Sequence, residues 1–197
     1  MKQAISFVIV FLSCISAAHA QDYYADYLSI GGGYYSAADG SHSSAFDAGY
    51  LNTSQGIIIG ADLQVKSITA TVFGVNNVGI SSATFSMYYG YYYPGPIVSP
   101  YIAGGLIFGF NGLESSDVTN ARPELVIKNS LSQSYGIFGM IGMQHELSGT
   151  FALFGDVRYG ADYIYTYIEN VSDEFVNLGG LYGRVGIRIT INSSEDL

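Results

Sequence analysis

Apolar and polar residues alternate along most of the chain, most clearly at 180–191, and the segment between Tyr135 and Tyr159 shows the alternation twice in succession. A turn at 147–149 divides this segment into two arms, and each arm keeps most of its apolar residues on one parity. Alternation with period two places two sets of side chains on opposite faces of a sheet. Each arm has about ten residues, the length of a tilted strand that crosses a bilayer. The segment predicts a β-hairpin, of a kind found both in membrane barrels and in soluble sandwiches.

The same pattern recurs and predicts eight strands, at residues 26–35, 56–66, 68–75, 81–93, 101–110, 135–146, 151–167 and 180–191. Long polar stretches, predicted as loops, cover 36–54, 111–134 and 169–178. Within 111–134 a helical turn and a continuation of the strands both stay open. Short turns alternating with longer loops are typical of a bacterial outer-membrane barrel. The predicted fold class is therefore all-β, an eight-stranded antiparallel up-and-down transmembrane β-barrel.

The N-terminal residues have the features of a signal peptide: Lys2, a short apolar run at 5–12, and Ala18-His19-Ala20. We expect a signal peptide at 1–20 that is cleaved after Ala20, a barrel domain at 21–191 and a polar tail at 192–197. Lipidation at Cys14 is the alternative. After ordinary cleavage the mature chain has no cysteine, because Cys14 is the only one, and it forms no disulfide.

Composition and charge narrow the class further. Hydrophobic residues make up 49% of the chain, yet no apolar run after residue 20 is long enough for a spanning helix. Apolar side chains must therefore fill a large core or face lipid as alternate strand residues. The formal net charge of -9 argues against nucleic acid as a partner, because phosphate binding needs a basic patch.

Three stretches give the chain a resemblance to the OmpA-like and opacity-protein family of small eight-stranded outer-membrane barrels. They are PYIAGG at 100–105, GMQHEL at 142–147 leading into DVRY at 156–159, and YGRVGIR at 182–188. The resemblance implies insertion by the barrel-assembly machinery and a surround of outer-membrane lipids. Family members usually end on an aromatic residue, whereas here the last predicted strand ends on Ile191 and six residues follow.

Charged residues on the polar parity of the predicted strands would face the barrel interior. They are Asp62, Lys66, Glu146, Asp156, Arg158, Arg184 and Arg188. An eight-stranded barrel is just wide enough inside for side chains, and buried charges of opposite sign are expected to pair. We predict an interior closed by ion pairs and hydrogen bonds, with a gated conduction path as the alternative.

Tyrosines are the predicted residues of the membrane interface, because the chain has no tryptophan. The candidates are Tyr89, Tyr91, Tyr93, Tyr101, Tyr159, Tyr163 and Tyr165. Tyrosines on exposed loops could instead bind a partner.

Catalytic chemistry has little support in the sequence. His42 lies among serines in a predicted loop, and His145 lies on the lipid-facing parity. A serine beside a histidine defines no catalytic geometry, and Asp173-Glu174 matches no calcium loop. We expect no catalytic residue, no cofactor and no metal site; a hydrolase that uses His42 is the alternative.

The predicted function is that of a non-enzymatic integral protein of a Gram-negative outer membrane, with a structural role and surface contacts through its three long loops. Recognition is expected on such loops because a rigid scaffold carries them. The partner would be a host molecule or another extracellular ligand. The alternatives are a narrow channel for small or apolar solutes and a secreted lipocalin-like binding barrel, which would need its apolar parity inside.

Overall fold

Strands make up most of the chain. The structure, a computed structural model, describes residues 24–37, 41–72, 74–121, 131–166 and 174–193. The strands are β1 (Tyr24–Ala37), β2 (His42–Ser54), β3 (Ile57–Val72), β4 (Val75–Tyr92), β5 (Ser99–Leu113), β6 (Leu131–Glu146), β7 (Phe151–Thr166), β8 (Glu174–Asn177) and β9 (Gly180–Ser193). A short helix, α2 (Ser115–Ala121), follows β5. Among the described residues, no helix is long and apolar enough to cross a membrane.

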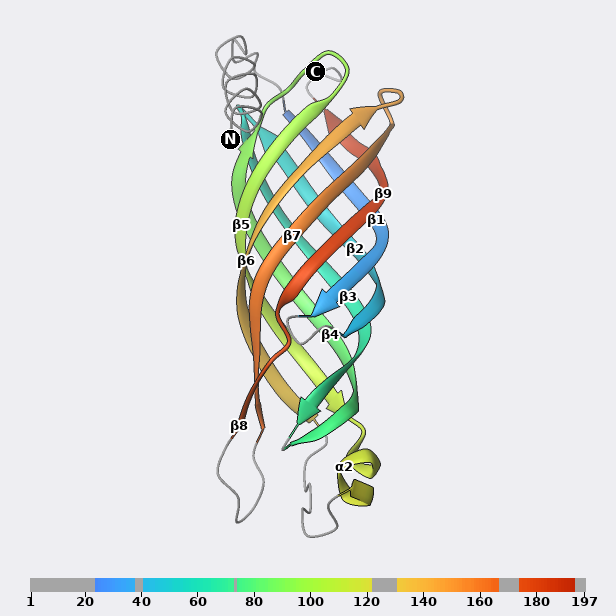
Figure 1. The fold of residues 1–197 in the computed structure, drawn as a ribbon. Coiled ribbons are helices and arrows are strands. Elements are labelled where there is room, and N and C mark those ends of the chain that lie inside the picture. The colour runs from blue at the N-terminus through green and yellow to red at the C-terminus, as the bar shows by residue number, and fades with distance from the viewer. Residues whose placement is uncertain (1–23, 38–40, 73, 122–130, 167–173, 194–197) are drawn as a thin grey trace, which may run out of the picture.

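Neighbouring strands pair antiparallel, and the pairing of β1 with β9 and of β6 with β7 closes the sheet into a barrel (Figure 1). β8 and β9 both pair with β7, and only Leu178 and Gly179 separate them. These two strands therefore occupy one position in the barrel wall. The wall has eight strand positions, which confirms the predicted fold class.

The prediction of a loop at 36–54 is wrong, because most of that stretch forms β2. This strand pairs with β1 along its whole length and with β3 from Ala45 onward. Its small polar residues have low strand propensity, but two partner strands supply backbone hydrogen bonds. β2 turns into β3 at Gln55 and Gly56, whose φ angles of 51° and 77° suit a two-residue hairpin turn.

The prediction of two strands at 56–66 and 68–75 is also wrong, because β3 is continuous through this region. Ser67 pairs with Ser81 of β4 within an unbroken register. β4 starts at Val75, so the residues between the predicted strands 68–75 and 81–93, whose Asn76-Asn77-Val78-Gly79 run is a typical turn signal, are likewise part of a strand. The prediction omits β2 and divides β3 into two strands. The total of eight is correct because these two errors cancel.

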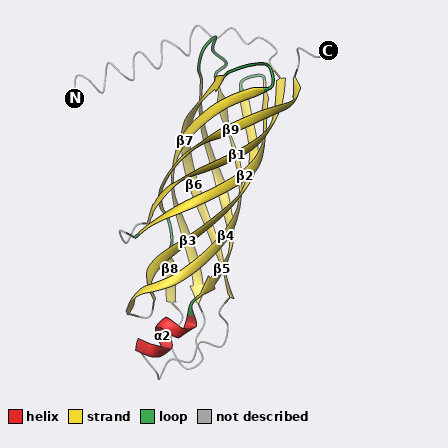
Figure 2. Ribbon diagram, turned by 90° about the vertical axis from the view of Figure 1, so that its right-hand side faces the viewer, coloured by secondary structure: helices red, strands yellow, loops and turns green. Residues whose placement is uncertain are grey.

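The two ends of the barrel differ. The start of β1, the end of β9 and the connections 55–56, 93–98 and 147–150 lie at one end, the terminal end. α2 and β8 lie at the other, the helix end (Figures 1 and 2). The predicted loops 111–134 and 169–178 both fall at the helix end, where strand residues and α2 occupy parts of them.

Several predicted segments fall partly or wholly outside the described residues. The predicted signal peptide at 1–20, residues 122–130 and 169–173 of the predicted loops, and Tyr167 of a predicted strand are among them. Asn192 and Ser193, predicted as part of the tail, belong to β9.

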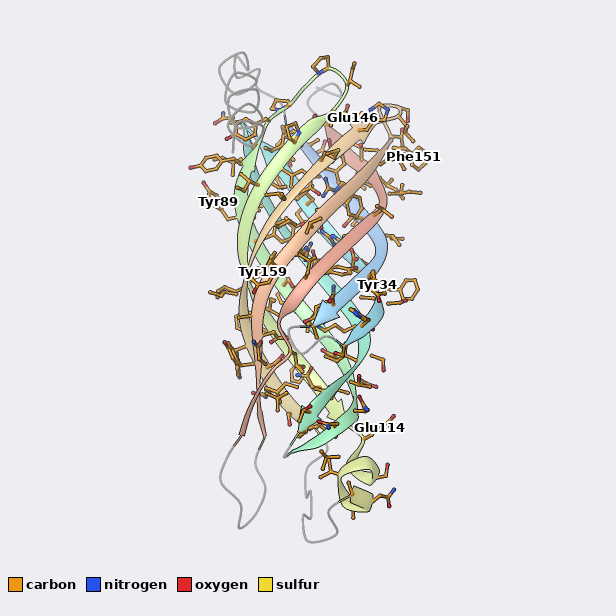
Figure 3. All side chains as sticks on the ribbon, viewed as in Figure 1. Tyr34, Tyr89, Glu114, Glu146, Phe151 and Tyr159 are labelled. Carbon is orange, nitrogen blue, oxygen red and sulfur yellow. The ribbon has the colours of Figure 1, made fainter. Side chains whose placement is uncertain are left out.

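Side chains alternate between the two faces of the wall. Large apolar and aromatic residues point outward around the barrel, and Figure 3 shows Tyr34, Tyr89 and Tyr159 on the outer surface. Charged and polar residues such as Asp62 and Arg184 point inward and are buried. This is the reverse of the arrangement that a soluble lipocalin-like barrel requires.

The alternation reverses at the helix end of β3. Up to Val65 the outward residues are mostly apolar, but beyond it Ser67, Thr69 and Thr71 point outward. The inward residues beyond Val65 become apolar after Lys66 and pack with those of neighbouring elements into a cluster, here called the apolar cap. The cluster also includes Tyr35, Ala37, Ala45 and Tyr182, and the name is kept for its remaining members: Ile68, Ala70, Val72, Val75, Val78, Ile80, Leu113, Val118, Ile164, Val176 and Leu178. Residues 67–72 and 75–81, which carry this reversed pattern, are called the helix-end extension.

Candidate functional site in the barrel interior

Six charged side chains from four strands meet inside the barrel and form what we call the charged belt. They are Asp47 from β2, Asp62 from β3, Asp156 and Arg158 from β7, and Arg184 and Arg188 from β9. Each is at most 6% exposed. The belt holds three carboxylates and three guanidinium groups, so its formal charges cancel.

Arg158 reaches across the barrel from β7 to β3. Its two terminal nitrogens donate to the two carboxylate oxygens of Asp62, at 3.0 and 2.6 Å. The guanidinium carbon lies 5.4 Å from the ring centre of Tyr88 and 5.1 Å from that of Phe138. A bidentate pair between aromatic rings is a strong and directional contact, and it holds opposite sides of the wall together.

Arg184 joins the remaining carboxylates. Its Nε donates to both oxygens of Asp156, at 2.8 and 3.0 Å, and its Nη1 donates to Asp47 at 2.5 Å and to Asp62 at 3.4 Å. The Tyr182 hydroxyl donates to the second oxygen of Asp47 at 2.7 Å. Arg184 therefore links all three acidic side chains of the belt.

Arg188 extends the belt toward the terminal end. Its Nη1 donates to Gln144 Oε1 at 2.6 Å, and its Nη2 donates to the Tyr101 hydroxyl at 3.1 Å. The Tyr101 hydroxyl in turn donates to Asp156 at 2.9 Å. The guanidinium carbon also lies 4.4 Å from the ring centre of Phe154. These contacts place large side chains across the bore.

Of the predicted interior residues, Asp62, Asp156, Arg158, Arg184 and Arg188 lie in the belt. Lys66 is buried but lies apart, on the side of the helix end. Glu146 is exposed at the terminal end, where the Tyr27 hydroxyl donates to it at 3.3 Å.

Asp47 is a belt residue that the sequence analysis missed. It lies in the stretch predicted as a loop, so it was not counted among inward-facing charges. A signal was present, because Ala45, Asp47 and Leu51 share a parity opposite to Phe46 and Tyr50.

The prediction of Tyr101 as an interface residue is wrong, because its side chain is buried inside the barrel. Tyr101 shares the parity of Ala103 on β5, opposite to the outward Ile102, and its hydroxyl completes the belt. The other predicted tyrosines lie elsewhere. Tyr89, Tyr91, Tyr159 and Tyr163 are exposed on the outer surface, Tyr93 is half-buried after β4, and the side chain of Tyr165 is outside the described part.

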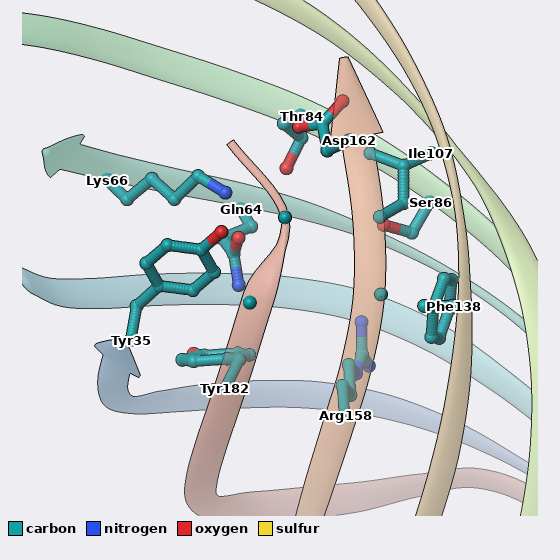
Figure 4. A pocket seen from close by; sticks show the side chains of 13 residues that line it. Tyr35, Gln64, Lys66, Thr84, Ser86, Ile107, Phe138, Arg158, Asp162 and Tyr182 are labelled. Atoms are coloured by element: carbon teal, nitrogen blue, oxygen red, sulfur yellow. The ribbon is translucent and has the colours of Figure 1, made fainter. Parts of the chain in front are cut away.

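A cavity lies between the charged belt and the apolar cap (Figure 4). It leaves about 40 Å³ for the centres of water-sized molecules. Lys66, Asp162 and Arg158 are among the residues that line it. The cavity occupies the part of the interior that neither the ion pairs nor the cap fills.

The two histidines of the described chain have no catalytic arrangement. His42 stacks on Tyr34 with ring centres 5.4 Å apart, and the Ser43 hydroxyl donates to the carbonyl of Ser44 rather than to the imidazole. The Nδ1 of His145 lies 2.5 Å from the carbonyl oxygen of Ile97. Within the described ranges, no group of three His, Cys, Asp or Glu side chains is placed to hold a metal ion.

Comparison with known proteins places the fold. No protein-family model matches the sequence, and no curated protein matches it. The crystal structure of Neisserial surface protein A is similar, with a TM-score of 0.57 and 13% identity over 87% of this chain and 98% of that one.

Two further structures are more distant. Outer membrane protein AlkL has a TM-score of 0.48 and 11% identity, over 89% of this chain and 93% of that one. Ail of Yersinia pestis has a TM-score of 0.42 and 10% identity, over 85% and 99%. The likeness to Neisserial surface protein A, at 13% identity, concerns the fold alone. The fold of the chain is that of the small outer-membrane β-barrels.

Proposed function

We propose that the chain is a non-enzymatic integral protein of the bacterial outer membrane that makes surface contacts through its helix end. The apolar outer surface supports membrane insertion, because a barrel in lipid turns its apolar side chains outward. The fold shared with Neisserial surface protein A supports the outer membrane as the location. The partners would be outer-membrane lipids, the barrel-assembly machinery, and a host or extracellular ligand.

The observation that carries the proposal is the reversed pattern of the helix-end extension. Outward Leu63 and Val65 are stable in lipid, whereas outward Thr69 and Thr71 with a buried apolar cap are the arrangement of a sheet in water. The extension therefore stands beyond the bilayer. Because bacterial barrels keep short turns in the periplasm and longer connections outside, the helix end is the one exposed to the surroundings.

The packed interior supports a closed barrel over the narrow-channel alternative. Arg158, Arg184 and Arg188 cross the bore, and the apolar cap lies beyond them. A water-filled path would have to pass both layers. Refolded residues 21–197, with folding checked by heat-dependent gel mobility, should insert into a planar bilayer without discrete conductance steps. Stable openings would make transport the leading function.

The orientation is tested by labelling single cysteines on intact cells with a membrane-impermeant maleimide. Asn120→Cys lies on exposed α2 at the helix end, and Gly149→Cys lies in the turn between β6 and β7, where an added Cβ meets open space. We expect labelling of Asn120→Cys on intact cells and of Gly149→Cys only after lysis. Labelling of Gly149→Cys alone on intact cells would refute surface contact through the helix end.

A further inference from the structure

We propose that the cavity between the charged belt and the apolar cap is a binding site for a small cluster of water molecules that bridges Lys66 and Asp162. We call it the Lys66–Asp162 chamber. The ligand class is neutral molecules that both donate and accept hydrogen bonds, and water is the smallest of them. Figure 4 shows side chains from several strands around this space, including Lys66 of β3, Thr84 of β4 and Asp162 of β7.

Asp162 is the first reason for a ligand. Its side chain is 2% exposed, and neither carboxylate oxygen has a hydrogen-bond partner among the described residues. Leaving a buried carboxylate without partners costs several kcal/mol. The Ser134 hydroxyl is one neighbouring donor, and a donor in the adjoining cavity would satisfy the remaining acceptor sites of these oxygens.

Lys66 is the second reason. Its ammonium lies over the ring of Tyr35, 4.0 Å from the ring centre, and it makes no ion pair with any carboxylate of the described chain. The two opposite charges line the same cavity without direct contact. Bridging water would serve both, because it accepts from the ammonium and donates to the carboxylate.

Neighbouring strands add an observation from residues just outside the cavity lining. Ser82 of β4, Asn111 of β5 and Ser134 of β6 are fully or almost fully buried, and their side chains also have polar atoms without a partner. These positions lie just below the apolar cap, since Ser82 is two residues from Ile80 and Asn111 is two from Leu113. Buried polar groups without partners in native proteins usually mark a bound water or ion.

Charge balance favours water over an ion. Lys66 and Asp162 cancel each other, and the belt holds three charges of each sign. An added ion would leave a net charge in a buried, low-dielectric space, which is costly. The free space of about 40 Å³ holds about three waters at 10–15 Å³ each.

The site is tested on the full-length mature protein in lipid bilayers by solid-state NMR, with magnetisation transferred from water to side-chain carbons. We expect transfer to the methyl group of Thr84, a residue that lines the chamber, and none to Val72 and Ile164, which lie in the apolar cap. Transfer to Thr84 as weak as that to Val72 in the native protein would overturn the proposal, whatever the variants do.

Two variants test whether the bound water depends on the charges of Lys66 and Asp162. Lys66→Met combined with Asp162→Leu removes both charges at similar side-chain size, and we expect the transfer to Thr84 to be lost. Asp162→Asn keeps a polar group there, and we expect transfer to remain. Undiminished transfer in the correctly folded double variant would also refute the bridge. If the double variant does not fold, the proposal is still tested by the transfer to Thr84 in the native protein and in Asp162→Asn.

Discussion

Residues 57–65 and 67–72 of β3 belong to one strand but have opposite arrangements of their side chains. In the first segment Leu63 and Val65 point outward and Asp62 points inward to Arg158. In the second, Thr69 and Thr71 point outward and Ile68 and Val72 lie in the apolar cap. The backbone register with β4 continues past the boundary between them. The comparison teaches that one strand can turn opposite faces outward along its length, which agrees with the proposed membrane boundary near Val65.

The largest expected effect concerns the inward charges. Arg158→Met leaves Asp62 without its bidentate partner and should destabilise the folded barrel by about 3–5 kcal/mol, because one buried charge loses its main compensation. Arg158→Met combined with Asp62→Leu should lose much less. Urea unfolding in lipid, followed by heat-dependent gel mobility, measures both. A double variant as unstable as the single one would mean that the belt is not held by this pair.

The next effect tests the outward face on both sides of the boundary. Leu63→Arg places a cation in the lipid-facing surface and should cost about 2–4 kcal/mol. Thr69→Arg, on the same strand and parity, should change stability by about 0.5 kcal/mol or less because that position faces water. The same unfolding assay compares them. Equal costs at the two positions would contradict a membrane boundary near Val65.

A smaller effect separates inward from outward tyrosines. Tyr101→Phe removes a hydroxyl that accepts from Arg188 and donates to Asp156, and the expected loss is about 1.5–3 kcal/mol, as for hydrogen bonds to charged groups. Tyr91→Phe, on the exposed outer surface, is the matched control and should be nearly neutral. A neutral Tyr101→Phe would show that this hydroxyl is dispensable in the belt.

The substitutions with the smallest expected effect on stability locate the proposed membrane boundary most precisely. The chain has no tryptophan, so a single introduced Trp is a clean fluorescent probe. Val65→Trp and Thr71→Trp, both outward, should fold equally well. Emission of the first should lie at shorter wavelength and be quenched by brominated lipid, and that of the second should be quenched by acrylamide in solution. Identical quenching of the two would place the boundary elsewhere.

Local alternation was sufficient for much of the fold and of the belt. In β9, Val185 and Ile187 point outward while Arg184 and Arg188 point inward, as the sequence predicted. The prediction for Tyr101 was wrong because residue type was given more weight than position. Its parity on the strand indicated the interior, whereas tyrosine in general favours the membrane interface. The sequence held the correct signal, but a general preference of tyrosine outweighed it.

β2 could not be recognised locally, because its small polar residues are typical of loops. It becomes a strand only where β1 and β3 flank it, and their positions depend on closure of the whole barrel. Asp47 was missed for the same reason. The ion pairs within the belt could not be predicted from the sequence either, because partners such as Arg158 and Asp62 are 96 residues apart in the chain.

The sequence by itself determined the architecture and the two faces of the wall, because the alternation of side chains along a strand is a local property of the backbone. Only the tertiary structure decided which segment forms the second strand, which guanidinium meets which carboxylate, and that the change of parity between Val65 and Ile68 falls within one strand. These depend on contacts across the barrel and on the solvent at each depth. Neither can be deduced from the order of neighbouring residues.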